Sequence, residues 1–262
     1  METQDHWGRL AGRIARMGPP QVPGPGIVAQ IADLCGGCTG VTVLLGVTPA
    51  YAGLGAPLLA FDASAGMIAA VWPGDDARRQ ARVADWTALP LADGGVRQVI
   101  GDGALNAVPD RDVLRAVLRE VRRVLLPTGR AALRVFTRPD PPETLDEVLR
   151  AATEGRIASL NVLRWRLASA LAVGPGHGVR VADIRQAALA LGDLAGFARA
   201  RGLSPDEGAH FDAYAGSAVT YVFPDRDSLA RDALDAGLTC AWTETAGYPG
   251  ATDCPIAVLQ PI

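Results

Sequence analysis

Residues 41–62 read VTVLLGVTPAYAGLGAPLLAFD and contain two short apolar runs separated by a turn of small residues. The runs at 41–45 and 57–61 lack polar alternation, which is typical of strands buried on both faces of a parallel sheet. Gly46 opens the turn after the first run, and Asp62 follows the second run directly. A strand, a small-residue turn and a second strand that ends on a carboxylate predict the start of a doubly wound α/β sheet.

The same alternation continues to about residue 136. Residues 63–71 predict a helix capped by Ser64, and residues 98–100 predict the core of another strand. Residues 111–125 place their Val and Leu side chains on one helical face, with arginines opposite. A Pro-Thr-Gly turn ends that helix, and residues 130–136 return as a strand. We therefore expect an α/β core over residues 41–140.

The pattern changes after the proline-rich segment 139–142. Helical segments are expected at about 143–153, 157–171, 181–191 and 194–201, which defines a helical insertion over residues 141–216. Residues 225–236 predict one more helix, and the runs 238–245 and 254–259 predict an antiparallel hairpin, so residues 217–262 complete the α/β core. Residues 1–40 form a helical extension with one amphipathic helix at about 8–17.

Composition excludes several kinds of function. The 25 basic and 28 acidic residues give a net charge of −3, which favours neither nucleic acid nor an anionic membrane. All 25 basic residues are arginine, so mechanisms that need a lysine Schiff base or a P-loop lysine are excluded. No apolar run approaches the roughly 20 residues of a membrane span, and Glu2 and Asp5 stand where a signal peptide carries positive charge, so a cytoplasmic protein is expected.

The four cysteines do not have the spacing of a zinc site. Cys35 and Cys38 lie in a C-G-G-C turn, whereas Cys240 and Cys254 are too far apart to form a second closely spaced pair. We expect four free thiols and no metal site.

Ligands of doubly wound sheets lie beyond the carboxyl ends of the strands. Those positions hold the small-residue turn from Gly46, the carboxylate Asp62, the pair Asp85-Trp86, and Gly101-Asp102-Gly103. A single carboxylate after a strand is usually a helix cap or a solvated turn residue. Carboxylates at successive strand ends, one beside an aromatic ring, favour a nucleoside site instead.

Five stretches resemble the class I S-adenosylmethionine-dependent methyltransferases. They are VLLGVTPA (43–50), LLAFDASAGMI (58–68), VADWTALPL (83–91), VIGDGALN (99–106) and LREVRRVLLPTGR (118–130). The resemblance covers about residues 41–136 and 221–261. It implies a Rossmann-like doubly wound sheet of seven strands with an antiparallel C-terminal hairpin, and S-adenosylmethionine as the cofactor.

The resemblance also implies roles for individual residues. Asp62 would bind the ribose and Asp85 the adenine amino group, with Trp86 lining the adenine pocket. We expect Gly46, Thr48, Ala63, Met67, Gly101 and Asp102 to complete the cofactor site. Asp102 is also the candidate catalytic base, although a role in the turn between its two glycines stays open.

The chain departs from the family at the first glycine motif. Leu44 stands at the usual acidic position, and Thr48 and Ala50 replace the second and third glycines. The expected function is methyl transfer to a small-molecule acceptor, with neither nucleic acid nor membrane as a partner and a homodimer left open. The alternatives are a non-catalytic S-adenosylmethionine-binding module and a nicotinamide-dependent oxidoreductase, although the G-x-G-x-x-G turn of the latter is missing.

Four further residues allow two interpretations each. Packing is favoured over a lid for Trp7, and a surface position over a functional one for His177. Arg164 and Arg166 flank Trp165 and are expected on a solvated face. Leu160, Leu163, Trp165 and Leu167 cannot share one helical face, so their helix should be buried on several sides and cover a closed acceptor pocket.

Overall fold

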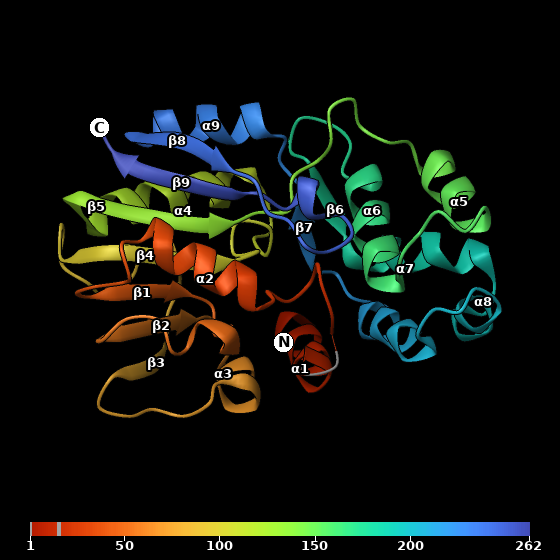
Figure 1. Ribbon diagram of the computed structural model, residues 1–262, viewed down its shortest axis with the longest axis horizontal. Coiled ribbons are helices and arrows are strands. Elements are labelled where there is room, and N and C mark those ends of the chain that lie inside the picture. The colour runs from red at the N-terminus through yellow and green to blue at the C-terminus, as the bar shows by residue number, and fades with distance from the viewer. Residues whose placement is uncertain (1, 15–16) are drawn as a thin grey trace.

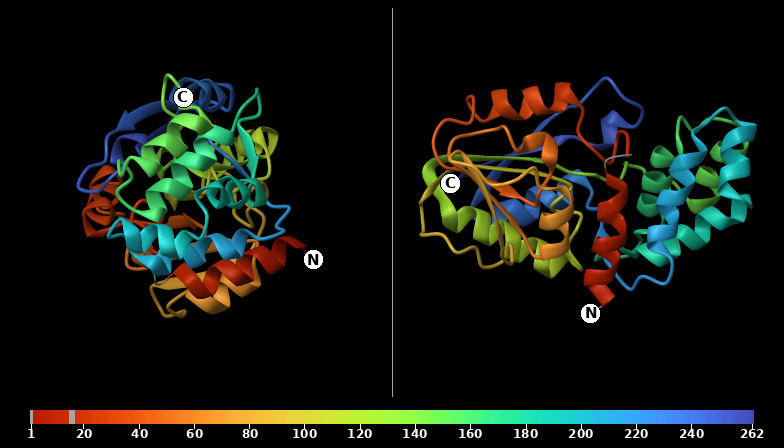
Figure 2. Two further views of the ribbon diagram at one scale, coloured as in Figure 1. Left: turned by 90° about the vertical axis from the view of Figure 1, so that its right-hand side faces the viewer. Right: turned by 90° about the horizontal axis from the view of Figure 1, so that it is seen from below.

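The computed structural model describes residues 2–14 and 17–262. An α/β lobe lies on one side and a helical lobe on the other, and helix α1 (Glu2–Ile14) stands between them (Figures 1 and 2). The helical lobe is formed by residues 145–222, which include most of the segment expected to be an insertion. A ligand that binds where the lobes meet can therefore contact all three parts.

A seven-stranded sheet forms the α/β lobe, in the order β3-β2-β1-β4-β5-β9-β8. Its strands are β1 (Thr42–Leu45), β2 (Leu58–Asp62), β3 (Arg79–Val83), β4 (Val96–Asp102), β5 (Leu125–Arg134), β8 (Leu238–Thr243) and β9 (Ile256–Pro261). The first five are parallel, whereas β9 runs antiparallel to both β5 and β8. The predicted doubly wound sheet with a reversed C-terminal hairpin is confirmed.

Helices cover both faces of the sheet (Figure 1). Helix α2 (Pro25–Leu34) packs Ile27 and Ile31 on one face, while α4 (Arg111–Val124) and α9 (Arg226–Asp235) cover the other. Side-chain caps fix where several of the helices begin. Ser64 accepts a hydrogen bond from the Met67 N–H and starts α3 (Ala65–Val71), as predicted. This burial on both faces explains why β1 shows no alternation.

Two details of the core differ from the sequence expectation. Strand β5 begins at Leu125, immediately after α4. Leu125 pairs with Val96, the pairing with β4 then shifts register across Pro127–Gly129, and it continues from Arg130 opposite Gln98. After β1 the chain forms only a three-residue 3₁₀ helix, η1 (Pro49–Tyr51), where an α-helix is usual in a doubly wound sheet.

The insertion contains the expected helices and more. They are α5 (Leu145–Thr153), α6 (Leu160–Leu171), α7 (Val181–Ala188) continued by η2 (Leu189–Leu191), and α8 (Leu194–Ala200). Almost every side chain of α6 is buried, which confirms the expectation of a helix enclosed on several sides. The sequence did not predict η3 (Pro205–Tyr214), nor the pairing of β6 (Gly178–Arg180) with β7 (Thr220–Val222). Because β7 pairs within this lobe, the lobe extends past residue 216.

The N-terminal extension holds two helices rather than one. Helix α1 begins earlier than predicted, and the predicted end of that helix at 15–16 lies outside the described residues. Helix α2 begins at Pro25, because proline suits the first turn of a helix. The prolines and glycines around it had suggested only an interrupted segment.

Candidate functional site

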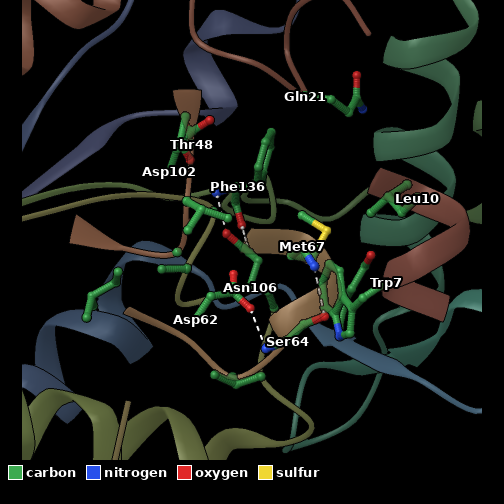
Figure 3. A pocket seen from close by; sticks show the side chains of 18 of the residues that line it. Trp7, Leu10, Gln21, Thr48, Asp62, Ser64, Met67, Asp102, Asn106 and Phe136 are labelled. Carbon is green, nitrogen blue, oxygen red and sulfur yellow. Dashed lines mark hydrogen bonds between the residues drawn. The ribbon is translucent and has the colours of Figure 1, made fainter. Parts of the chain in front are cut away.

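A cavity of about 910 Å³ lies between the carboxyl edge of the sheet, helix α1 and the insertion. The sheet contributes residues after β1, β2, β3 and β4, and the N-terminal segment contributes Trp7, Leu10 and Gln21 (Figure 3). The insertion contributes residues of α6, α7 and η3, followed by Tyr221 and Phe223. Three distant parts of the sequence therefore enclose one space.

All but one of the predicted site residues line this cavity. They are Gly46, Thr48, Asp62, Ala63, Met67, Asp85, Trp86 and Asp102. Gly101 does not line it. An added Cβ there would lie 3.1 Å from Leu133 and 3.3 Å from Ala104, so this glycine permits close packing within the sheet.

Gly46 takes a backbone conformation that other residues rarely adopt. Its φ is +94°, and its N–H donates to the Phe61 carbonyl oxygen at 2.7 Å. An added Cβ would be 3.8 Å from the Trp86 ring, so the backbone stays open to the cavity. The glycine that the sequence retains is the one whose backbone geometry requires it. Thr48 directly precedes η1, and Ala50 lies within it.

Asp62 is a partly buried carboxylate at the end of β2. Its Oδ1 accepts from the Ser64 N–H at 2.8 Å (Figure 3). Burial raises the pKa of Asp62 from 3.8 to about 6, and the Ser64 hydrogen bond offsets only part of this effect. A carboxylate with so few donors is suited to accept hydrogen bonds from a ligand's hydroxyl groups.

Asp85 and Trp86 are held by local contacts. The Asp85 Oδ1 accepts from the N–H and the hydroxyl of Thr87, both at 2.8 Å, and the residue is exposed. The Trp86 indole N–H donates to the Phe61 carbonyl oxygen at 2.6 Å, which fixes the ring at the end of β2. Asp85 thus keeps its other oxygen available beside a fixed aromatic ring.

Asp102 forms a buried ion pair that the sequence analysis did not identify. Its Oδ1 accepts from Arg134 Nε, and its Oδ2 accepts from Arg134 Nη2 at 3.0 Å. Arg134 is fully buried and also donates to the Pro20 carbonyl oxygen and the Tyr248 hydroxyl, at 2.7 and 3.1 Å. The sequence did contain a signal for this pair, because Arg134 lies within the otherwise apolar run 131–136 that was predicted to be a strand. The pair ties β4 to β5, the N-terminal segment and the β8–β9 connection.

Asn106 has a structural role. Its Nδ2 donates to the carbonyl oxygens of Phe136 and Val222, at 2.8 and 2.7 Å, and its Oδ1 accepts from the Phe136 N–H at 2.9 Å (Figure 3). These bonds join the end of β5 to β7. They hold the insertion against the carboxyl edge.

The structure corrects two expectations for charged side chains. Arg164 is 3% exposed and lines the cavity, so it does not lie on a solvated face, whereas Arg166 forms an ion pair with Glu143. His177 is buried rather than at the surface, with Nε2 3.7 Å from Asp225 Oδ2. Burial lowers the pKa of His177, and Arg138 adds to this effect. Trp7 packs on both lobes as well as lining the cavity.

Within the described residues, no group of three or more metal-ligating side chains is close enough to hold an ion. No helix in the described ranges is long and apolar enough to cross a membrane. The four cysteines are free thiols, and Cys35, Cys38 and Cys254 are buried.

Comparison with known families gives a match within the α/β core. Residues 34–133 match the family described as a methyltransferase domain. This segment runs from the end of α2 to β5 and includes the predicted cofactor-site residues. No curated protein sequence matches the chain significantly.

Solved structures show the same fold at low sequence identity. The CcbJ methyltransferase from Streptomyces caelestis matches with a TM-score of 0.56 and 12% identity, over 98% of both chains. A complex of DhpI with S-adenosylhomocysteine matches with a TM-score of 0.53 and 17% identity, over 99% of this chain and 97% of that one. A protein from Rhodobacter sphaeroides described as a putative zinc-dependent alcohol dehydrogenase matches with a TM-score of 0.60 and 13% identity, over 100% and 98%.

Proposed function

We propose that this chain is a class I S-adenosylmethionine-dependent methyltransferase and that it methylates a small molecule bound under the insertion. The match of residues 34–133 to a methyltransferase domain and the fold shared with solved methyltransferases support the proposal. One observation carries the proposal. The strand-end residues expected to hold the cofactor share a single cavity of about 910 Å³ with residues of α1 and the insertion. Small-molecule pockets span about 300–1,000 Å³, so this volume has room for a cofactor and a modest acceptor together.

The residues present fit S-adenosylmethionine. The Asp62 carboxylate accepts one hydrogen bond within the described structure, whereas a carboxylate can accept about four, so a ribose diol supplies donors that it lacks. The exposed Asp85 carboxylate and the fixed ring of Trp86 suit an adenine amino group and its flat face. We assign the methionine portion to the open turn at Gly46 and Thr48, with Ala63 and Met67 completing the lining.

Bound S-adenosylmethionine supplies a methyl group that is already electrophilic. The chain therefore needs chiefly to align the acceptor and exclude water, and alignment can contribute about 7–11 kcal/mol to lowering a barrier. Asp102 is less suited to the role of base than the sequence suggested, because Arg134 engages both of its carboxylate oxygens. We infer that Asp102 positions the end of β4 and that any proton of the acceptor is lost to bulk solvent after methyl transfer, when the product leaves the site.

Titration calorimetry with S-adenosylhomocysteine tests the proposed site. We expect saturable binding to the wild-type protein and a loss of about tenfold or more in Asp62→Ala, because charge-assisted hydrogen bonds contribute about 1.5–3 kcal/mol each. Asp112→Ala is the matched control, since Asp112 lies exposed on α4 and does not line the cavity. Absence of binding to the wild-type protein would remove the proposal.

A non-catalytic binding module is the second candidate. It is favoured by the 3₁₀ turn in place of a helix after β1 and by the ion pair that engages Asp102. Mass spectrometry of a small-molecule pool incubated with the protein and isotopically labelled S-adenosylmethionine separates the two. A labelled product supports the enzyme, and cofactor binding without any labelled product supports the module.

A further inference from the structure

Arg164 is a buried cation whose side chain lines the cavity. It lies on α6, is 3% exposed and lines the space between the lobes. No carboxylate of the described residues lies within 4.0 Å of its guanidinium, whereas Arg134 and Arg166 each pair with an acid. A buried charge is costly unless it is paired, so this position calls for a compensating anion.

The contacts that Arg164 does make are weak. Its Nη2 lies 3.4 Å from Asn161 Oδ1 and 3.7 Å from the Met17 sulfur, both at the long limit of hydrogen bonding. Its Nη1 is buried and has no partner among the described residues. The guanidinium is 5.6 Å from the centre of the Tyr214 ring. None of these contacts neutralises the charge.

The two tyrosines next to Arg164 supply no anion. Tyr214 and Tyr221 are neighbours with ring centres 6.2 Å apart, and burial holds the pKa of Tyr221 well above its ordinary value, so it stays a neutral phenol. The hydroxyl of Tyr221 lies 3.0 Å from His6 Nε2. An imidazole or a phenol leaves the positive charge of Arg164 in place.

The cavity wall beside Arg164 is aromatic. Tyr214 and Tyr221 line it together with Trp7, whose ring centre is 6.1 Å from that of Tyr221, and with Trp165 and Phe136. Flat apolar faces of this kind bind planar groups by stacking and edge contacts. Trp7 also packs against the buried cluster that contains Met67, so this aromatic wall extends toward the expected cofactor site.

We propose that the methyl acceptor is a small aromatic acid whose carboxylate pairs with Arg164 while its ring lies against Trp7, Tyr214 and Tyr221. The planar guanidinium fork matches a carboxylate in a bidentate pair, which gives orientation as well as affinity. The carboxylate is the anchor, and the methylated atom lies elsewhere on the ring system, toward Asp62 and Gly46. This assignment rests on the proposed function, since it names the acceptor of that same site.

The test measures acid binding separately from cofactor binding. Benzoate, 4-hydroxybenzoate and indole-3-carboxylate are titrated into the protein saturated with S-adenosylhomocysteine, each beside its neutral primary amide. We expect at least one acid to bind at least ~tenfold more tightly than its amide, because only the acid can form a charge-assisted pair with Arg164.

Variants of Arg164 locate the effect. Arg164→Met should weaken the binding of that acid at least ~tenfold and abolish its preference over the amide, and Arg164→Lys should retain part of it. Arg166→Met is the matched control on the same helix, because Arg166 pairs with Glu143 and does not line the cavity. Should Arg164→Met fail to fold, Arg164→Gln provides the same comparison.

The outcomes separate the two proposals. Binding of S-adenosylhomocysteine without any preference for acids overturns the acceptor assignment and leaves the proposed function standing, as does acid binding that survives in Arg164→Met. Failure of S-adenosylhomocysteine to bind the wild-type protein overturns the proposed function instead.

Discussion

Asp62 should destabilise the free protein at neutral pH, and Asp62→Asn should relieve this effect. Burial raises the pKa of its carboxyl from 3.8 to about 6, so folding disfavours the ionised form. The shift of about two pKa units corresponds to about 3 kcal/mol at 1.36 kcal/mol per unit. The expected destabilisation is about 2 kcal/mol, because Asp62 is only partly buried and water screens its charge.

The pH dependence gives the prediction its sign. A folded-state pKa above the unfolded value means that the destabilisation is absent below pH 3.8 and fully present above about pH 6. At pH 7.5, Asp62→Asn should raise the melting temperature by about 4–8 °C, since 1 kcal/mol shifts a chain of this size by about 2–4 °C. At pH 4.5, the advantage should fall to about a third of that value.

Differential scanning calorimetry of both proteins between pH 4.5 and 8 measures this difference. The amide side chain introduced by Asp62→Asn retains an oxygen that accepts from the Ser64 N–H. The substitution therefore changes the charge at this position and keeps the hydrogen bond. Asp112→Asn, at an exposed position on α4, is the control and should show no comparable gain. A lower melting temperature for Asp62→Asn at pH 7.5, or an advantage that does not change with pH, would refute the reasoning.

Three further predictions concern the ion pair, the adenine site and the insertion. Arg134→Met should lower the free energy of unfolding by about 3–5 kcal/mol, because it leaves the buried Asp102 carboxylate unpaired. Urea denaturation measures this loss, and the double variant Arg134→Met with Asp102→Leu should recover much of it. Trp86 fluorescence should change when S-adenosylhomocysteine is added, and Trp86→Phe should remove most of the change; an unaltered wild-type spectrum at saturation would place adenine elsewhere. Hydrogen exchange in α6 and η3 should slow when cofactor and acceptor are bound, whereas protection confined to 46–86 would place the insertion outside the ligand site.

Local sequence patterns determined the α/β core. The unbroken apolar runs before Gly46 and Asp62 identify buried parallel strands, because each strand is covered on both faces and cannot tolerate polar alternation. The Ser64 cap and the arginine-lined outer face of α4 are likewise readable from neighbouring residues. The grouping of Asp62, Asp85 and Asp102 at one edge then follows from topology, since parallel strands bring their carboxyl ends to the same edge of a sheet.

The insertion shows where such patterns lose information. Nearly all of α6 is buried, so no polar face marks its exposed side, and the sequence could not tell that Arg164 points inward while Arg166 pairs with Glu143. The same holds for His177, whose glycine-rich surroundings suggested a surface loop. Burial of a charged side chain depends on which elements pack around it, and those elements are distant in the chain.

The sequence by itself determined which residues can form a nucleoside site and at which edge of the sheet they gather. Only the tertiary structure decided that helix α1 and the insertion enclose a cavity at that edge. It also decided that Arg134 forms an ion pair with Asp102, and that Arg164 lines the cavity with no counter-ion among the described residues. The physical reason is range: strand and helix patterns reflect contacts a few residues apart, whereas charge pairing and cavity closure join side chains more than thirty to more than a hundred residues apart.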